Sequence, residues 1–316
     1  MYYEFYTGSP IHIKGDIMNE RKKHVIKMAH QLFIEKGFQA TSIQDILTYS
    51  GISKGTFYNY FSSKSELLIA LFRTIYKQLE KERNDLLIGQ DPSNIEIFIK
   101  QLELQLETNR ANKLISLFEE VIFSNDEELK QYIKRGHLRI LQWKYHRFID
   151  IFGEDKEPYL LDCAVMFMGI LHNNLKYNNL AHGSNASLSK IVRYCVSRIV
   201  KIVDEVAEAE DQLLKPELLE NWLPNCKGND HAFKNSLYHS ILELKKALIH
   251  HEEKSKYIEL LDFIQEEIVD SKKPRKFLIE LTIQTLKQEK VLFAHKELLQ
   301  IEQLISAYFT QIEEID

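Results

Sequence analysis

Apolar residues recur every three or four positions along almost the whole chain, a spacing typical of amphipathic α-helices. Glycine and proline, which mark turns and interrupt helices, number only 11 and 6 among the 316 residues. A turn-rich all-β fold is therefore disfavoured. We predict an all-α protein.

The first predicted helix covers residues 19–36. Its apolar positions share one face, formed by Val25, Ala29, Leu32 and Phe33. Gly37 supplies the left-handed residue that commonly ends a helix. The helix therefore has a defined end and one face suited to a core.

Two short helices are predicted to follow. Thr41 and Gln44 have the spacing of a capping box that opens the second helix, and Gly51 ends that helix. Ser53 is a natural N-cap for a third helix over 54–60. Short helices joined by a glycine-containing turn have the geometry of a helix-turn-helix.

Further helices are predicted along the rest of the chain. Ser63 with Glu66 forms a second capping box, which opens a longer helix. The later periodic stretches are 93–110, 112–123, 125–152, 158–181, 187–206, 208–222, 232–252, 254–270, 275–289 and 291–313. Residues 222–229 form the clearest linker.

The third helix has the chemistry of a recognition helix, which enters the major groove and needs small or polar residues near its start. Phe57 and Phe61 are expected to face the core. Residues that can offer polar groups to bases or phosphates are Lys54, Gly55, Thr56, Tyr58, Asn59 and Tyr60. The stretch therefore favours DNA binding.

Two segments carry a more specific pattern, GFQATSIQDI at 37–46 and SGISKGTFYNYFSSKSELL at 50–68. Their order and spacing closely resemble the TetR/AcrR family of bacterial regulators. Ser50 departs from the family pattern, which usually has alanine there. The resemblance covers nearly fifty residues and is far more specific than a generic helix-turn-helix.

The resemblance implies a set of DNA contacts. Phosphate contacts are expected at the start of the second helix, groove contacts along the third, and a phosphate anchor at the start of the fourth. The residues are Thr41, Ser42, Lys54, Gly55, Thr56, Tyr58, Asn59, Tyr60 and Lys64. The tyrosines could instead pack in a core, and the lysines could simply be solvated.

The resemblance also implies an effector-binding and dimerisation domain over residues 67–206, after a DNA-binding domain over 18–66. Aromatic and histidine side chains in its middle are candidates for the effector pocket: Phe118, Phe123, Trp143, His146, His172 and Tyr177. Aromatic residues at helical spacing more often form a core, so that alternative stays open.

Family members commonly dimerise through their last two core helices, which correspond to 158–181 and 187–206. The candidate interface residues are Leu161, Val165, Met168, Leu188, Val192, Cys195, Ile199 and Val203. The same stripe could pack within one chain. A homodimer would place two recognition helices on successive major-groove turns of a near-palindromic operator.

Charge adds a weak signal. The chain has a net charge of −5, but residues 18–66 hold seven Lys or Arg against four Asp or Glu. A locally basic region can attract phosphates although the whole protein is acidic, because electrostatic fields are screened over about 10 Å.

Several classes of function are disfavoured. Cys163, Cys195 and Cys226 are widely spaced, which favours a reducing cytoplasm over a disulfide framework. The longest apolar stretch, 163–171, is too short to cross a bilayer, and residues 1–17 look like a disordered leader. No cofactor-binding, metal-binding or catalytic motif is evident, so we predict a non-enzymatic protein that needs no cofactor.

Residues 207–316 lie outside the part that resembles the family and form a C-terminal extension. Its helices are amphipathic, with one face at Phe233, Leu237, Ile241, Leu244 and Leu248 and another at Leu298, Ile301, Ile305, Tyr308 and Ile312. The extension could cover a dimer, enlarge the effector domain or recruit a protein partner. Packing within the regulator is the default expectation.

The leading hypothesis is a homodimeric repressor that leaves operator DNA when a small hydrophobic effector binds. The alternative is a helical interaction protein whose extension recruits a partner. A largely exposed apolar face on residues 232–313 would favour the alternative.

Overall fold

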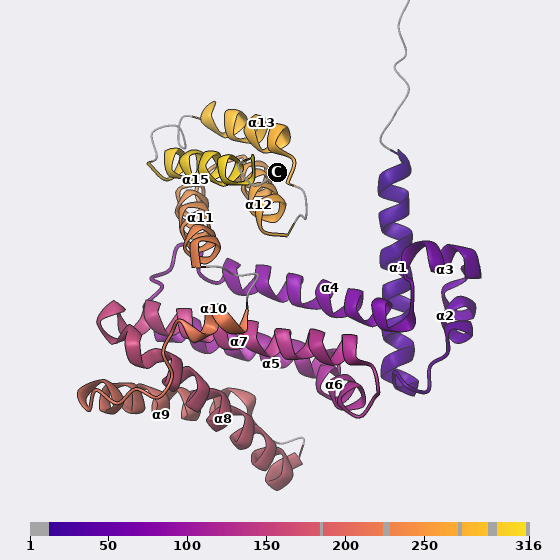
Figure 1. Cartoon of the computed structure of the whole chain (residues 1–316), viewed down its shortest axis with the longest axis horizontal. Coiled ribbons are helices and arrows are strands. Elements are labelled where there is room, and N and C mark those ends of the chain that lie inside the picture. Colours follow the sequence, from indigo (N-terminus) through magenta and orange to yellow (C-terminus); the bar gives the residue numbers. More distant parts are fainter. Residues whose placement is uncertain (1–12, 184–185, 224–227, 271–273, 290–295, 314–316) are drawn as a thin grey trace, which may run out of the picture. The chain divides into compact units, whose positions relative to one another are not determined.

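The computed structural model describes residues 13–183, 186–223, 228–270, 274–289 and 296–313. These residues form helices joined by turns, with no strand among them, so the predicted all-α class is confirmed (Figure 1). Within the same ranges, no helix combines the length and the apolar character needed to cross a bilayer.

The chain packs as two compact units, and the first contains the described residues up to Lys81 together with Leu104–His137. Its helices are α1 Ile13–Lys36, α2 Ile43–Ser50, α3 Lys54–Tyr60 and α6 Leu114–Ile122, with the first part of α4 Lys64–Asp85. The helix α1 begins at Ile13 rather than at the predicted Asn19, and residues 1–12 of the predicted leader lie outside the described residues.

One hydrophobic core holds the first unit together. Phe33, Phe57 and Phe61 from the predicted helix-turn-helix are all buried in it. Phe72 of α4 and Leu117 of α6 are buried in the same core. The packing therefore does not divide at residue 66, because α4 and α6 supply part of the apolar surface on which α1–α3 rest.

The second unit contains Glu82–Glu103 and the chain from Leu138 onward. Parts of α5 Ile95–Ala111 and α7 Glu127–Phe152 join η1 Glu154–Lys156, α8 Glu157–His182, α9 Leu188–Glu208 and α10 Leu218–Trp222. An aromatic cluster lies at its centre, with ring centroids 5.8 Å apart for Phe98 and Phe167 and 5.7 Å apart for Phe148 and Phe167. The helices α8 and α9 pack along each other (Figure 1).

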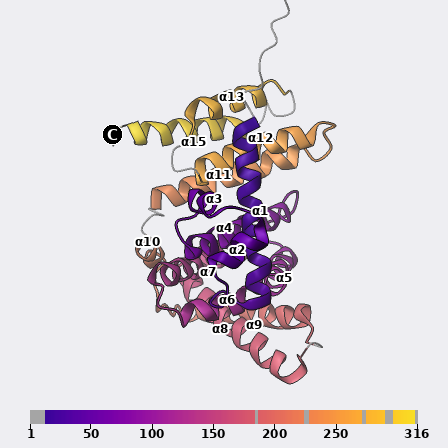
Figure 2. The same ribbon diagram turned by 90° about the vertical axis from the view of Figure 1, so that its right-hand side faces the viewer.

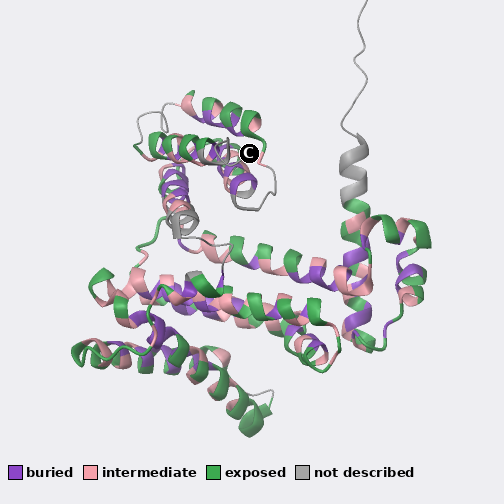
Figure 3. Cartoon of the chain, viewed as in Figure 1, coloured by how far each residue is buried: buried purple, intermediate pink, exposed green. Residues whose placement is uncertain are grey.

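Most of the predicted dimer stripe lies inside this unit rather than on its surface. The buried members are Leu161, Val192, Cys195, Ile199 and Val203, and Leu188 is half-buried. Packing between α8 and α9 already removes this stripe from water within one chain, as in the alternative stated above, and the dimer interface stays a prediction. Of the predicted set, Val165 is exposed and Met168 half-buried, and the outward faces of both helices remain open to solvent (Figure 3).

The C-terminal extension contains a four-helix bundle, formed by α11 Gly228–Ala247, α12 Lys254–Asp270, α13 Lys276–Lys287 and α15 Lys296–Glu313. Contacts run from α11 to α12, from α12 to α13, from α13 to α15 and from α15 back to α11, so the bundle is closed (Figure 2). Both predicted apolar faces point into its core, from Leu237, Ile241 and Leu244 to Ile301 and Ile305. The side chain of Ile312 lies outside the described residues.

Two contacts fasten the extension within the second unit. The buried carboxylate of Asp162 on α8 accepts hydrogen bonds from the backbone N–H of Leu213 at 2.8 Å and of Leu214 at 3.1 Å. Leu242 of α11 packs in a small buried cluster with Leu87 and Ile97. The chain that leaves α9 is therefore held to α8 before the bundle begins.

Candidate DNA-binding surface

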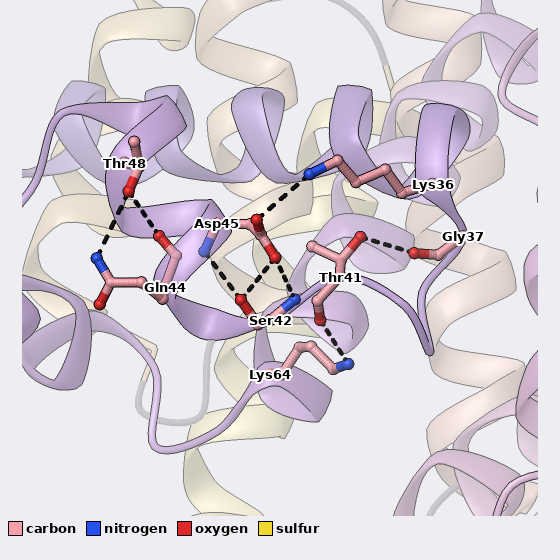
Figure 4. Close-up of polar contacts among 8 residues, drawn as sticks. All are labelled: Lys36, Gly37, Thr41, Ser42, Gln44, Asp45, Thr48 and Lys64. Carbon is pink, nitrogen blue, oxygen red and sulfur yellow. Dashed lines mark hydrogen bonds and ion pairs between the residues drawn. The ribbon is translucent and has the colours of Figure 1, made fainter.

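The start of α2 is fixed by Ser42 and Asp45 rather than by the predicted pair Thr41 and Gln44. The Ser42 hydroxyl accepts a hydrogen bond from the Asp45 N–H at 3.0 Å, and the Asp45 carboxylate accepts one from the Ser42 N–H at 2.9 Å (Figure 4). Hydrogen bonds from Ser42, together with nearby Lys36, lower the pKa of Asp45 to about 2. The capping box is therefore formed one residue later than predicted.

Thr41 is an interior residue. Its side chain is 0% exposed, and its hydroxyl donates a hydrogen bond to the Gly37 carbonyl at 2.7 Å. A side chain so placed cannot reach a phosphate in this conformation. The exposed Ser42 is the polar side chain that the start of α2 presents to solvent.

Lys64 holds the loop between α1 and α2. Its ammonium donates to the Thr41 carbonyl at 2.7 Å (Figure 4). It also donates to the Phe38 carbonyl at 2.8 Å and lies 4.5 Å from the centroid of the Phe38 ring. Desolvation lowers the pKa of Lys64, while the charge of Glu120 opposes that shift. These contacts use the donors that a phosphate would need, so we interpret Lys64 as a positioning residue.

A carboxylate from α6 holds the same loop from the other side. Glu120 accepts a hydrogen bond from the Gln39 N–H at 2.9 Å. Gly37 has φ +85°, and a Cβ atom there would lie 2.9 Å from Glu120 Oε1. Glycine is needed at this position both for the left-handed backbone and for the close approach of α6.

The helix α3 presents a polar surface over a buried aromatic base. Phe57 is buried, and the Ser53 hydroxyl accepts a hydrogen bond from the Thr56 N–H at 3.1 Å to cap the helix. The predicted contact residues Lys54, Gly55, Tyr58 and Asn59 are exposed, while Thr56 and Tyr60 are half-buried. The structure therefore brings together on α3 six of the nine predicted DNA contacts.

The sequence prediction overlooked two residues beside this helix. An open hollow next to the start of α3 is lined by Arg21 and His24 from α1, together with Gly51, Ser53 and Thr56. The run Arg21-Lys22-Lys23 near the beginning of the first predicted helix was the available signal. The positive charge of Arg21 beside the start of α3 makes this hollow a candidate extension of the DNA-binding surface.

The predicted effector residues are divided between the two units. In the first unit, Phe118 packs against Phe72 with ring centroids 5.0 Å apart, while Phe123 is 87% exposed. In the second unit, Trp143 and His146 are half-buried on α7, whereas His172 and Tyr177 are exposed on α8. The effector pocket stays a prediction, because aromatic spacing along helices does not show which rings meet.

Comparison with known proteins identifies the family of the chain. Residues 25–71 match the family model for bacterial regulatory proteins of the tetR family. The uncharacterized HTH-type transcriptional regulator YerO of Bacillus subtilis is 30% identical over 268 residues, covering 83% of this chain and 88% of its own length. The uncharacterized HTH-type transcriptional regulator YuxN of the same organism is 30% identical over 198 residues, covering 62% of this chain and 67% of its own.

Two further results bear on how far the likeness reaches. The HTH-type transcriptional repressor KstR2 of Mycobacterium tuberculosis is 36% identical over 56 residues, covering 18% of this chain and 28% of its own. No solved structure matches the chain. The YerO match is too long to fit within residues 1–206, so it includes part of the C-terminal extension.

The fold and the exposed polar face of α3 define a helix-turn-helix DNA-binding protein. The chain belongs to the TetR family of bacterial regulatory proteins. It is a DNA-binding transcriptional regulator and not an enzyme.

Proposed function

We propose that this regulator is a homodimeric repressor that binds a near-palindromic operator through α3 and releases it when a small effector binds. The observation that carries the DNA-binding part is the exposed row of Lys54, Gly55, Tyr58 and Asn59 above the buried Phe57. A recognition helix that contacts bases in the major groove must expose polar side chains while the core beneath it holds the helix in place. The name of KstR2, a repressor, supports repression rather than activation.

The proposed contact set differs from the one implied by the resemblance alone. Groove contacts are assigned to Lys54, Gly55, Tyr58 and Asn59, with Thr56 and Tyr60 at their edge. Ser42 and Arg21 are assigned to flanking phosphates. Thr41 and Lys64 act indirectly, by fixing the loop that leads into α2.

The function is tested by selecting fragments of the source genome that the purified full chain retains. Retained fragments are then titrated at several salt concentrations. A repressor with this surface should enrich a near-palindromic sequence and bind it with a steep dependence on salt. If no sequence is enriched, the proposed operator binding is overturned. If none of many compounds releases the chain from the enriched DNA, the proposed effector control is overturned.

The proposed dimer interface is the outward face of α8 and α9. It carries exposed apolar or aromatic side chains that packing inside the unit leaves uncovered: Val165, Met166, Tyr177, Leu180 and Tyr194. The most exposed of them is Leu180, at 80%. A face of this kind on one pair of helices suits self-association about a two-fold axis.

We expect Leu180→Glu combined with Tyr194→Glu to weaken the dimer at least tenfold, because two carboxylates would lose hydration on association. Sedimentation across a range of protein concentrations measures the change. Lys100→Glu, at an exposed position on α5, is the control and should leave the dimer intact. Unchanged association of the double variant would place the interface elsewhere.

The alternative function, recruitment of a protein partner by the extension, has less support. A largely exposed apolar face on residues 232–313 would have favoured it. The faces that suggested it are instead buried within the four-helix bundle.

A further inference from the structure

The amide of Asn59 on α3 has no partner within the described part of the chain. Its side chain is exposed, and no hydrogen bond joins it to any other residue that the structure describes. Two other polar side chains of α3 are engaged. The Thr56 hydroxyl lies 2.9 Å from the Ser53 hydroxyl, and half-buried Tyr60 has its ring 6.2 Å from that of Phe61. The Asn59 amide is therefore available to a partner outside the chain.

The chemistry of this amide differs from that of the other exposed positions of α3. Lys54 carries donors only, which bind phosphate oxygens and the acceptors of guanine alike, and Tyr58 carries a single hydroxyl. Asn59 carries one donor group and one acceptor, fixed in one plane. In the major groove, adenine presents the N7 acceptor beside the N6 donor, and an asparagine amide pairs with both. Asn59 is therefore suited to recognise one base among four.

Gly55, one helical turn before Asn59, is not required by the fold. Its φ is not positive, and a Cβ atom there would meet only the Ser53 hydroxyl at 3.9 Å, an ordinary van der Waals contact. Glycine within a helix is less stable than alanine, because it loses more backbone freedom on folding. Neither the backbone nor the packing of the chain explains glycine at this position. Close approach of another molecule would explain it.

The positions of Gly55 and Asn59 connect these two observations. Residues four apart are neighbours on one face of a helix, and helical side chains lean toward the preceding turn. The Asn59 side chain therefore leans toward the turn that carries Gly55. Asparagine is short, so its amide reaches a base only when the helix backbone lies close to the groove floor. The missing Cβ at Gly55 leaves room for that approach, and buried Phe57 supports the helix from below.

We propose that Asn59 determines the base specificity of α3 by recognising one adenine in each operator half-site, and that Gly55 permits the approach this requires. The Asn59 Oδ1 accepts from the N6 amino group, and Nδ2 donates to N7. The inference rests on the proposed function and deepens it, since it names a base of the operator. The neighbouring exposed amide, Gln44 of α2, has its nitrogen 3.5 Å from the Thr48 hydroxyl (Figure 4).

Base substitutions in the selected operator test the role of Asn59. Each base pair of a half-site is replaced in turn, and the full chain is titrated at low salt, where weakened complexes still form. At one A·T pair, every replacement should lower affinity about fivefold or more, as expected for a bidentate base contact. Asn59→Ala should lose the preference at that pair alone and keep the salt slope, because no charge is removed. Gln44→Ala, the matched control, should keep the preference.

Gly55→Ala tests the second part with two measurements that should move in opposite directions. Its thermal unfolding midpoint should rise, because alanine favours the helix, while operator affinity should fall about fivefold or more. Gly136→Ala on α7 is the control, since a Cβ atom there meets nothing within 4 Å. It should raise the midpoint and leave operator affinity unchanged. A lower midpoint for Gly55→Ala, or unchanged affinity, would show that this glycine does not serve the approach to DNA.

Three results would overturn the role of Asn59. They are a preference that survives in Asn59→Ala, a preference lost in Gln44→Ala instead, and an Asn59→Ala variant that loses affinity for every sequence alike. Each of them presupposes an operator that the parent chain selects, so the proposed function would stand while this inference failed. If the parent chain selects no operator, the proposed function fails and this inference fails with it.

Discussion

Alanine at both Lys54 and Tyr58 should lower operator affinity by about a hundredfold or more, since each lost groove or phosphate contact costs roughly 1–3 kcal/mol. Both side chains are exposed on α3, and Phe57 loses the ring of Tyr58 at 5.4 Å but keeps its contact with Phe61 at 5.7 Å. The fold should therefore survive the double substitution. Titration of the selected operator at several salt concentrations measures the loss, and the slope should fall by about one for the lysine.

Lys64→Met is the informative comparison for that experiment. Its ammonium donates to the Phe38 and Thr41 carbonyls, so its loss should loosen the loop before α2 by roughly 1–2 kcal/mol. Affinity should drop while the salt slope stays the same, because no phosphate contact is removed. A slope reduced as much as in Lys54→Ala would show that Lys64 contacts phosphate in the complex after all.

A second large effect is expected in the pH dependence of stability. Burial lowers the pKa of Lys144 on α7 to about 7 in the folded chain, against an ordinary value of 10.5. Between these values the unfolded chain binds one proton more than the folded chain, so raising the pH favours folding. The contribution of Lys144 to the unfolding free energy should rise by up to about 1.4 kcal/mol per pH unit from pH 7 toward pH 10.

Comparison with Lys144→Met isolates this contribution from other titrating groups. Thermal unfolding of both proteins is followed at intervals between pH 6.5 and 9.5. The variant should be more stable than the parent near pH 7, and the difference should shrink as the pH rises. A difference that does not depend on pH would mean that Lys144 keeps its ordinary pKa in the folded chain.

The helices could be predicted from the sequence. The residues that cap a helix, and the element that covers a given apolar face, could not. Thr41 with Gln44 and Ser42 with Asp45 have the same spacing, one residue apart. The structure uses the second pair because Thr41 faces the core and donates to Gly37. Spacing alone does not show which of two adjacent residues turns inward.

The apolar stripes illustrate the same limit at the level of tertiary structure. Periodicity correctly identified Val192, Cys195 and Ile199 as one face of a helix, but not α8 as the element that covers it. Lys144 is the opposite case, a polar residue whose burial the sequence does not indicate. It lies in the polar run Lys144-Tyr145-His146-Arg147, which resembles a solvated helix face. Only tertiary packing makes that position an interior one.

The closed bundle formed by α11, α12, α13 and α15 also has an evolutionary consequence. Its main apolar faces cover one another, and the contact of Leu242 with Leu87 and Ile97 joins the bundle to the rest of the second unit. Selection for folding therefore acts on inward positions such as Leu244, Ile264 and Ile301, and leaves outward positions free to drift. Related regulators should keep the inward pattern of this module while its surface diverges, so that the module could be gained, kept or lost as a unit without rebuilding the DNA-binding head.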